Sequence, residues 1–586
     1  MEIKINTAVN FKRRLKKSEE AEYSAVLKEA KEKAGNKGKS ILILPTTALP
    51  QNSSNNTGIG NLASEEGQAF LDFAKKYWGI NEIQLLPIGQ FHGSKYRPYS
   101  GTSMDFGNHM INIKKHATKE EFDELVKNNT VNNRVNYKNI IDKDSKQEEI
   151  LKKIYERNLN DKAFKNFKTK NFERLEPKAL YSALSDVYGN SNYNKWNLID
   201  QNLYSLDAAQ RNARINELSE KYAKEIDFYK FKQFLAESDF KEAKEQLNSK
   251  GLKLDGDLIC GFSKDEVWAH PKAFVKHGTI GWGLPSLDFE TPEAENLLRE
   301  KVRFYAKHFD GIRIDASWTY VDHPVHKGKE IKYYQDKFLN IIDEEFKNVK
   351  GKNFDLHNIM HEFIADVKDF NIYDSWQLKP YVRDRVKIYT SDYIEDIWGS
   401  NNGFLQRGWD KTKFVIGATN HDSELIKFNQ KHAKILARIL NIPEEKLMNK
   451  KEFVKAKFAE PFMAFNNMIF FREALGLKEG ENKILADFEK DYINKLSKGE
   501  VFNAMDALEK IFVAKNLDKT EPELFKKIVK YRKILEKKST PPAIKLAIGG
   551  ALAIALVFGA TVIFKQRNKN ENAGKILNIS TNLNSD

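Results

Sequence analysis

The sequence predicts an α/β fold in which short buried strands of a parallel sheet alternate with amphipathic helices. Three observations support this fold class. Near the start of the chain, an apolar strand, a helix and a second apolar strand follow one another as in a βαβ unit. Further along, three apolar runs each end in an acidic residue. Between these two regions, from 114 to about 250, the strand signal vanishes, which predicts an inserted helical subdomain.

The chain begins with a charged helical lead-in, residues 1–38, and the main domain is expected to span 39–535. The first strand, 40–45, has four apolar residues and ends in a proline. An amphipathic helix over 65–78 then leads into the apolar strand 83–87. This rhythm predicts that the two strands are parallel and that the helix covers the sheet.

The loop after the second strand is rich in tyrosine and polar groups, among them Tyr99, Ser100 and Asn108. Loops that follow parallel strands hold the binding residues of barrel enzymes, so this loop is a candidate binding segment. An ordinary Gly/Pro loop with packed tyrosines is the alternative. The inserted helices follow, and then the strand 251–260 and a loop that contains Trp268.

The next strand contains two charges, Arg313 and Asp315, in an otherwise apolar run. An unpaired charge in a strand core is costly to bury. Residues two apart on a strand point the same way, so this cation and carboxylate can lie side by side at the strand's carboxyl end. The pattern indicates a functional site, and a structural salt bridge at the strand end is the alternative.

Two later strands also end in acids. The strand 358–362 ends in Glu362, and the strand 413–417 is followed by His421 and Asp422. Acids at the carboxyl ends of different parallel strands meet at one mouth if the sheet closes into a barrel. Two carboxylates at such a mouth suit glycoside chemistry, in which one acid protonates the leaving oxygen and the other attacks the anomeric carbon.

Composition narrows the class of protein. With 586 residues, 41% of them hydrophobic, the chain can bury a large core. Its net charge of +14 is spread among interleaved Lys, Glu and Asp without a basic block, so we expect no nucleic-acid partner. The one cysteine, Cys260, allows no intramolecular disulfide and is expected to be a buried, inert thiol. No His/Cys cluster has metal-ligand spacing, so neither a metal nor a cofactor is expected.

The C-terminal region predicts a membrane anchor. A basic linker, 536–545, precedes 19 uncharged residues, 546–564, which as a helix span about 28 Å, close to the thickness of a bilayer core. A polar tail, 565–586, follows. A buried core helix is the alternative, but such a helix usually keeps a polar stripe. Because basic residues are more numerous before the span than after it, we expect a membrane-anchored protein whose large domain is cytoplasmic.

The order of these motifs resembles the amylomaltase, or 4-alpha-glucanotransferase, family of retaining enzymes that act on alpha-1,4-glucans. The resemblance covers roughly 41–477 and is weakest over 114–226. The motifs that carry it are Leu44-Pro-Thr-Thr-Ala-Leu-Pro50, Gly58-Ile-Gly-Asn-Leu62, Gln84-Leu-Leu-Pro-Ile-Gly89, Pro98-Tyr-Ser100, Tyr229-Lys-Phe-Lys-Gln-Phe-Leu235, Gly256-Asp-Leu258, Glu266-Val-Trp-Ala-His-Pro271, Arg313-Ile-Asp315 and His421-Asp422.

The resemblance implies a (β/α)8 barrel with inserted subdomains and a double-displacement mechanism. It implies Asp315 as the nucleophile, Glu362 as the acid/base and Asp422 as the third catalytic acid, which helps to hold and distort the sugar. Arg313 would orient the nucleophile and keep it ionised. The substrate-binding residues expected on this basis are Arg313, Tyr99, His421, Trp268, Asn108 and Ser100.

The chain also departs from the family pattern. Ala316-Ser-Trp-Thr319 stands where the family reads His-Phe-Arg-Gly, His361-Glu-Phe363 stands where it reads Ala-Glu-Asp, and Ser263 replaces an Asp that contacts substrate. The expected function is a 4-alpha-glucanotransferase that moves alpha-1,4-glucan segments to an acceptor glucan or glucose. An alpha-amylase-type hydrolase and an inactive, membrane-tethered glucan-binding protein remain as alternatives.

Overall fold

The computed structural model describes residues 15–536, which belong to one compact unit, Met1–Glu536. The gaps within the described residues are 92–100, 132–133, 281–282, 321–330, 363–385, 391–393, 399–409, 420–425, 478–491, 493–494, 497 and 499. The predicted membrane span, 546–564, and most of the predicted linker lie outside the described residues. Within the described part of the chain, no helix combines the length and the apolar character needed to cross a bilayer.

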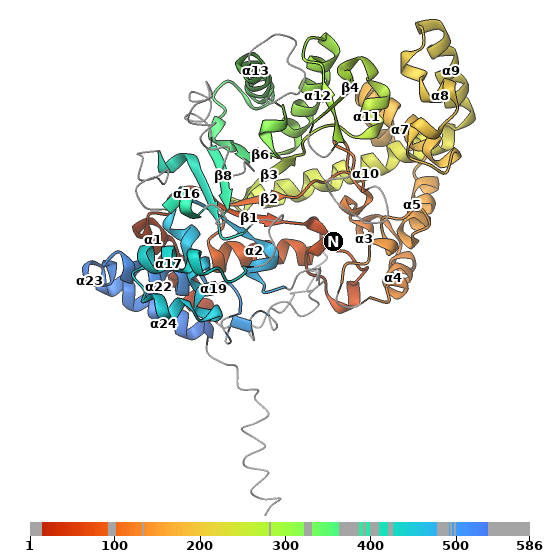
Figure 1. Cartoon of the computed structure of the whole chain (residues 1–586). Coiled ribbons are helices and arrows are strands. Elements are labelled where there is room, and N and C mark those ends of the chain that lie inside the picture. Colours follow the sequence, from red (N-terminus) through yellow and green to blue (C-terminus); the bar gives the residue numbers. More distant parts are fainter. Residues whose placement is uncertain are drawn as a thin grey trace, which may run out of the picture. The chain divides into compact units, whose positions relative to one another are not determined.

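Eight parallel strands close into a barrel at the centre of this unit (Figure 1). Strand β1 closes the ring by pairing with both β2 and β10. In order around the barrel the strands are β1 (Ser40–Leu44), β10 (Asn466–Phe470), β9 (Phe414–Gly417), β8 (Val386–Thr390), β7 (Ile359–Glu362), β6 (Gly311–Ile314), β3 (Lys253–Leu258) and β2 (Glu82–Leu85). The predicted α/β barrel is confirmed.

The strands are short and buried because helices cover the outside of the barrel and side chains fill its inside. Alternate residues of β1 show both environments. Leu42 and Leu44 belong to the main core under the helices, whereas Ile41 and Ile43 belong to a smaller apolar cluster inside the barrel. The sequence run Ile-Leu-Ile-Leu therefore has no polar face because neither face meets solvent.

Helices surround the barrel, and local sequence fixes their ends. In α2, for example, Ser64 accepts a hydrogen bond from the Gly67 N–H, and Gly79 ends the helix with φ 67°. The helices around the barrel are α1 (Lys17–Ala34), α2 (Glu65–Trp78), α12 (Pro292–His308), α13 (Ile331–Lys350), α16 (Ile394–Trp398), α17 (Gln430–Leu440), α18 (Glu444–Leu447), α19 (Lys450–Ala459), α20 (Phe471–Ala474), α22 (Ala504–Ala514), α23 (Leu517–Thr520) and α24 (Pro522–Glu536).

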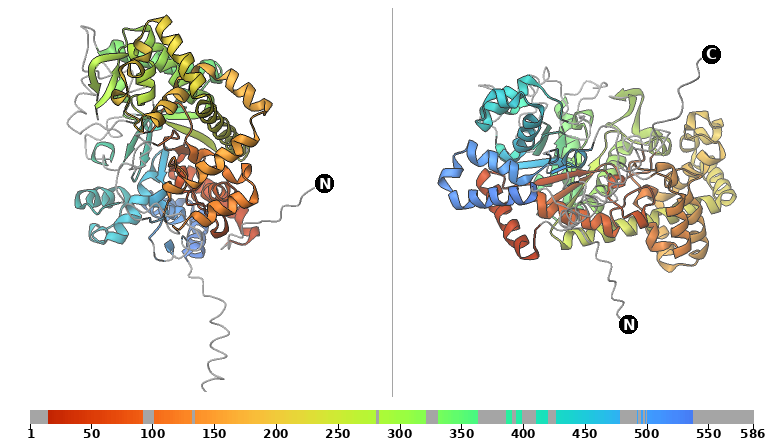
Figure 2. Two further views of the ribbon diagram at one scale, coloured as in Figure 1. Left: turned by 90° about the vertical axis from the view of Figure 1, so that its right-hand side faces the viewer. Right: turned by 90° about the horizontal axis from the view of Figure 1, so that it is seen from below.

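A helical insertion separates β2 from β3. It lies on one side of the barrel, and the C-terminal helices α17 to α24 lie on the opposite side in Figure 1 and in the right-hand view of Figure 2. Its helices are α3 (Ile113–His116), α4 (Lys119–Asn128), α5 (Lys146–Arg157), α6 (Lys162–Lys170), α7 (Phe172–Val187), α8 (Leu198–Gln201), α9 (Ala208–Lys221) and α10 (Ala223–Ser249). Helix α11 (Lys264–Ala269) and the antiparallel pair β4 (Phe274–Ile280) and β5 (Leu284–Leu287) follow β3.

The register of the barrel divides its interior into an apolar part and a polar part. Residues paired across parallel strands point to the same face, so the pairs Ile41↔Glu82, Ile43↔Gln84 and Gln84↔Asp255 carry the inward direction from β1 to β3. The pair Asp257↔Arg313 extends it to β6. The polar part of the interior therefore leads along β2, β3 and β6 to the carboxyl end of the barrel.

Candidate active site

Arg313 is the centre of a charged cluster at the carboxyl ends of three barrel strands. Its side chain is 1% exposed. Its Nη1 donates to Asp257 Oδ1 of β3 at 2.6 Å, and its Nη2 lies 3.0 Å from Asp315 Oδ1. The same Nη2 contacts the Glu362 carboxylate at the end of β7. One buried cation thus joins three carboxylates, which makes its burial tolerable and fixes their positions.

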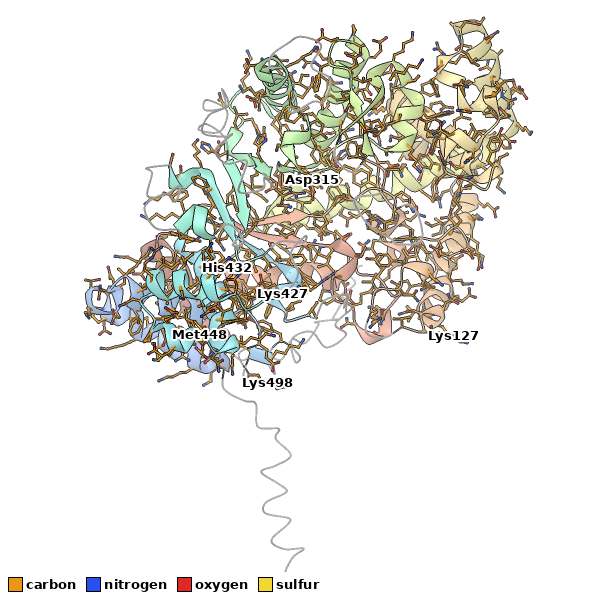
Figure 3. The ribbon with its side chains drawn as sticks, in the orientation of Figure 1. Lys127, Asp315, Lys427, His432, Met448 and Lys498 are labelled. Carbon is orange, nitrogen blue, oxygen red and sulfur yellow. The ribbon has the colours of Figure 1, made fainter. Side chains whose placement is uncertain are left out.

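Asp315 lies just beyond β6, at the mouth of the barrel, and Figure 3 shows it near the centre of the described chain. Its N–H donates to the Leu258 carbonyl at 2.9 Å, which extends the pairing with β3 by one bond. The Cys260 thiol lies within the field of this carboxylate. Burial, together with the charge of Asp315, raises the pKa of the thiol to about 12. Cys260 therefore remains protonated beside Asp315.

Two of the positions at which the chain departs from the family pattern touch each other. Ser317 Oγ and His361 Nδ1 lie 3.0 Å apart, and both side chains are fully buried. Where the family pattern has Phe and Ala, this chain has Ser and His at these two positions. Ala316, which precedes Ser317, has φ 41° and turns the chain out of the strand in the left-handed region. Ser317 and His361 thus pack against each other beside Asp315.

Asn108 and Trp268, two of the predicted substrate-binding residues, lie at the junction of barrel and insertion. The N–H of Asn108 donates to Gln90, and its side chain donates to Glu148 Oε2 on α5 at 3.1 Å. Trp268 is 2% exposed and packs in the core of the insertion, with its indole N–H bound to the Asp200 carbonyl. Their assignment to substrate binding stays a prediction, and the structure gives both a packing role.

Four predicted site residues lie outside the described residues. They are Tyr99, Ser100, His421 and Asp422. Among the predicted site residues that are described, Arg313, Asp315 and Glu362 come together. The third predicted catalytic acid therefore remains a prediction.

Sequence reasoning missed two members of the cluster, Asp257 and Cys260. Asp257 lies in the motif Gly256-Asp-Leu258, and its position two residues after Asp255 on one strand indicates a second inward-facing acid. Cys260 was expected to be a buried, inert thiol, but its side chain is only half-buried. Its high pKa fits the expected inertness, but its interaction with Asp315 gives it a place beside the reacting group. That contact depends on the register between β3 and β6, which spacing along the sequence does not reveal.

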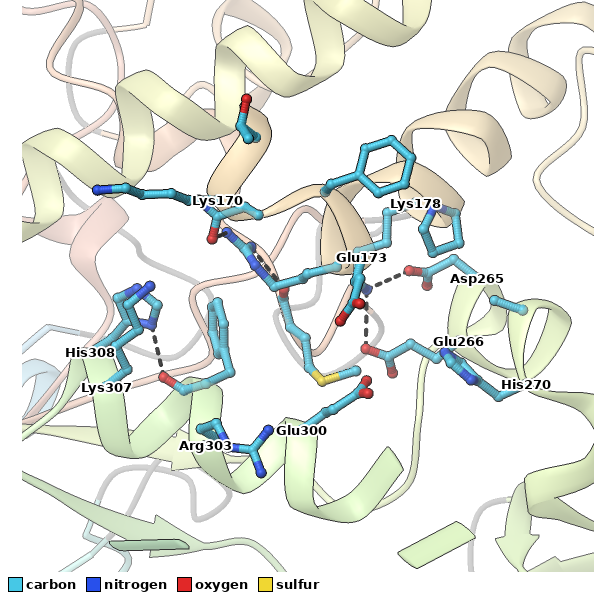
Figure 4. Close-up of a pocket in the computed structure, with 18 residues that line it drawn as sticks. Lys170, Glu173, Lys178, Asp265, Glu266, His270, Glu300, Arg303, Lys307 and His308 are labelled. Atoms are coloured by element: carbon cyan, nitrogen blue, oxygen red, sulfur yellow. Dashed lines mark hydrogen bonds and ion pairs between the residues drawn. The ribbon is translucent and has the colours of Figure 1, made fainter. Parts of the chain in front are cut away.

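A second buried charged cluster joins the insertion to the barrel (Figure 4). Lys178 of α7 donates to Asp265 at 2.6 Å and to Glu266 at 3.1 Å, both on α11. Burial lowers the pKa of Lys178, but the two carboxylates outweigh it and raise the pKa above the ordinary value. The cluster forms one wall of a pocket of about 560 Å³ between α7 and α12. In the described part of the chain, no group of three or more His, Cys, Asp or Glu side chains is placed to hold a metal ion.

Comparisons with known proteins agree with this geometry. A protein-family profile described as 4-alpha-glucanotransferase, glycoside hydrolase family 77, matches residues 44–375, more than half of the chain. The chain belongs to this family. A 4-alpha-glucanotransferase from Clostridium butyricum is 26% identical to this glucanotransferase-family chain over 417 residues, which is 63% of this chain and 78% of that protein.

Two solved structures share the fold of this family member at low sequence identity. The amylomaltase from Streptococcus agalactiae, solved in complex with acarbose, matches with a TM-score of 0.59 at 14% identity, over 82% of this chain and 99% of that one. The amylomaltase from Corynebacterium glutamicum matches with a TM-score of 0.51 at 13% identity, over 77% of this chain and 70% of that one. The barrel with its insertion is therefore the family fold.

Proposed function

We propose that this chain is a 4-alpha-glucanotransferase that moves segments of alpha-1,4-glucans to an acceptor glucan or glucose by retaining double displacement. The observation that carries the proposal is the contact of one guanidinium with Asp315 and Glu362 at adjacent strand ends. Membership of the family and the curated relative named above support the same activity.

The spacing of the two carboxylates favours retention of configuration. Both contact the same nitrogen of Arg313, so their contacting oxygens lie no more than two hydrogen-bond lengths apart, about 6 Å. Retaining enzymes hold their two carboxyl groups about 5–5.5 Å apart, whereas inverting enzymes leave about 6.5–9.5 Å for a water molecule. We expect the carboxyl separation of this site to fall in the shorter range, which suits direct attack on the sugar by one of the acids.

The resemblance to the family assigns the roles of the two acids. Asp315 attacks the anomeric carbon while Glu362 gives its proton to the departing glycosidic oxygen, which releases the first glucan and leaves a glucosyl ester on Asp315. Glu362 then takes the proton from the 4-hydroxyl of the acceptor as that oxygen attacks the ester carbon and Asp315 leaves. Arg313 holds both carboxylates in place through the two half-reactions.

The assignment is tested by replacing Asp315 with Asn. We expect that maltotriose is no longer converted to longer oligomers and glucose, while the melting temperature stays close to that of the wild type. Asp123→Asn, which changes an exposed acid on α4, is the matched control and should leave transfer unchanged. Persistent chain lengthening in the Asp315 variant would show that another group is the nucleophile.

An alpha-amylase-type hydrolase is the second candidate function, because the segment next to Asp315 departs from the family pattern. Ala316 and Ser317 differ from the family pattern and border the site at which water or an acceptor sugar must arrive. Chain lengthening from maltotriose supports transfer, and glucose release without lengthening supports hydrolysis. Glucan binding that occurs without turnover and is unaffected by Glu362→Gln would support an inactive binding protein instead.

We also propose that residues 546–564 anchor the protein in a membrane with its large domain on the cytoplasmic side. The uncharged length of the segment and the basic residues before it support this proposal. The full chain should remain in the membrane pellet after an alkaline carbonate wash, and a variant with Lys at Ile554 and Phe558 should be released. Wild-type protein that is released by the wash would refute the anchor, and protease protection of the large domain in intact cells checks its orientation.

A further inference from the structure

Lys301 of α12 is a buried cation whose hydrogen-bond acceptors among the described residues are all neutral. Its side chain is fully buried. Its ammonium donates to the Ile259 carbonyl at 2.7 Å, to the Gly261 carbonyl at 2.5 Å and to the Tyr320 hydroxyl at 3.1 Å. An ammonium has three donors, and here each has an oxygen acceptor. In the part of the chain that the structure describes, Lys301 thus satisfies its hydrogen bonds without the carboxylate partner that usually accompanies a buried lysine.

The two carbonyls flank Cys260, in a segment that includes the carboxyl end of β3 and the residues just after it. This segment, 257–261, supplies three contacts to the proposed nucleophile and its arginine. Asp257 accepts from Arg313 at 2.6 Å, the Leu258 carbonyl accepts from the Asp315 N–H at 2.9 Å, and the Cys260 thiol lies within the field of the Asp315 carboxylate. Lys301 therefore binds the same segment that contacts Asp315 and its arginine.

Tyr320 takes part in the same group of hydrogen bonds and links it to the chain that follows β6. We call the Lys301 ammonium, the Ile259 and Gly261 carbonyls and the Tyr320 hydroxyl the clamp. The Tyr320 hydroxyl donates to the Ile259 carbonyl at 2.8 Å and accepts from Lys301. Burial raises the pKa of this hydroxyl well above its ordinary value, so it remains a donor. The Lys301 ammonium thus connects the residues after β3 with the chain after β6, which contains Asp315.

We propose that Lys301 is a positioning residue for the sugar-transfer reaction, acting on Asp315 through the segment 257–261. The inference rests on the proposed function. Lys301 lies on a helix outside the barrel. Its charge determines how tightly the segment 257–261, which contacts the nucleophile, is held. Because the ammonium binds carbonyl oxygens, its charged form holds them more strongly than a neutral amine.

The clamp carries its own dependence on pH. Burial lowers the pKa of Lys301 to about 8, against the charges of nearby acidic groups, which raise it. The groups that face it are Glu266, Cys260 and Asp315, which raise its pKa, Lys178, which lowers it, and the hydroxyl of Tyr320. Above about pH 8 the amine is neutral and the clamp loosens.

Activity and stability should therefore respond to pH in opposite ways. The folded-state pKa lies below the ordinary value of 10.5. Between about pH 8 and 10.5 the unfolded chain holds the proton more tightly, so the contribution of Lys301 to stability rises with pH. A loss of transfer activity over that interval without a lower melting temperature is the signature of the clamp.

The test compares Tyr320→Phe, Lys301→Arg and Lys301→Met with the wild type in two measurements. The first is the pH profile of kcat and KM for maltotriose. The second is the rate at which iodoacetamide alkylates Cys260, which as the one cysteine of the chain reports on the segment without requiring activity. The matched control is Lys31→Met, which removes another buried lysine bound to a hydroxyl and a carbonyl, at the start of β1.

We expect opposite shifts from the two conservative variants. Tyr320→Phe removes an acceptor, so the alkaline limb of kcat should move to lower pH, whereas the permanently charged Arg should move it to higher pH. Lys301→Met should lower kcat at least about tenfold with KM within about twofold, the scale of a misplaced reacting group. It should also speed Cys260 alkylation at least about tenfold. Lys31→Met should leave the alkylation rate and the alkaline limb unchanged.

The outcomes separate the clamp from the proposed function. If the alkaline limb and the alkylation rate of Tyr320→Phe and Lys301→Arg coincide with those of the wild type, the positioning role is refuted, even if Lys301→Met does not fold. If alkylation changes as expected but the wild type transfers no sugar, the clamp stands and the proposed function falls.

Discussion

Replacing Ser317 with Phe and His361 with Ala, singly and together, tests whether the two departures beside Asp315 form one packed unit. The two side chains are fully buried and hydrogen-bonded at 3.0 Å. The double variant restores the two residue types of the family pattern, one large and one small. Each single variant places either two large residues or two small ones in the same space.

The structure gives the expected magnitudes. Ser317→Phe alone adds an aromatic ring to a filled site, which costs about 1–3 kcal/mol, and it takes the partner from His361 Nδ1 at a further cost of about 1–3 kcal/mol. His361→Ala alone leaves a cavity the size of an imidazole, at about 2–4 kcal/mol. In the double variant the ring of Phe fills that cavity and no imidazole remains unpaired. We therefore expect the double variant to be about 1–3 kcal/mol more stable than the sum of the single effects.

The assay is urea unfolding followed by tryptophan fluorescence, with the midpoint and slope compared among the four proteins. The matched control combines His361→Ala with Ser185→Ala, a buried serine of α7 that bonds the Tyr181 carbonyl within its own helix. That pair should be additive within about 0.5 kcal/mol. If the Ser317 and His361 changes are equally additive, the two departures are independent and the repacking argument is wrong.

Two further predictions concern other buried charges. Asp257→Ala should cost about 2 kcal/mol of stability, because it removes a charge-assisted bond from Arg313, and should lower kcat with little change in KM; unchanged kinetics would show that Asp315 and Glu362 suffice to hold the arginine. For Glu237 of α10, burial raises the pKa, but the hydrogen bond from His308 and the nearby cations lower it to about 2. The stability it contributes is therefore complete above about pH 4.5 and is lost as the pH falls toward 2. Glu237→Gln should destabilise by about 3 kcal/mol at pH 7 and by little at pH 2 in thermal unfolding, whereas the exposed Glu242→Gln should have little effect at either pH.

The barrel could be predicted because its strands carry strong local signals. The run after Ser40 is apolar on both faces, which occurs where helices cover a sheet whose other side is filled. The importance of two acids at strand ends, Asp315 and Glu362, could also be predicted. A charge at the end of a buried strand requires a partner or a function. The structure supplies the partner as a single guanidinium, Arg313.

The remaining contacts depend on tertiary structure. Trp268 belongs to a motif of the family, but its side chain packs into an apolar cluster that α7 and α9 help to form. The role of Lys301 was equally hidden. On the sequence it is one of many lysines in an amphipathic helix, and the carbonyls it binds are more than 35 residues away. Backbone acceptors leave no mark on the side-chain pattern, so such a clamp can be found only in the fold.

The polar part of the barrel interior explains why Arg313 binds the acids at the carboxyl ends of the strands rather than an acid deeper in the barrel. Below Arg313 on β3 lies Asp255, whose pKa is raised well above its ordinary value by burial and by the charge of Glu82. The acid form of Asp255 is therefore favoured more than that of an ordinary carboxyl, which weakens its attraction for the guanidinium. All the ionic partners of Arg313 among the described residues lie at the carboxyl ends of the strands. The cation is thus directed toward the two carboxylates that the proposed reaction uses.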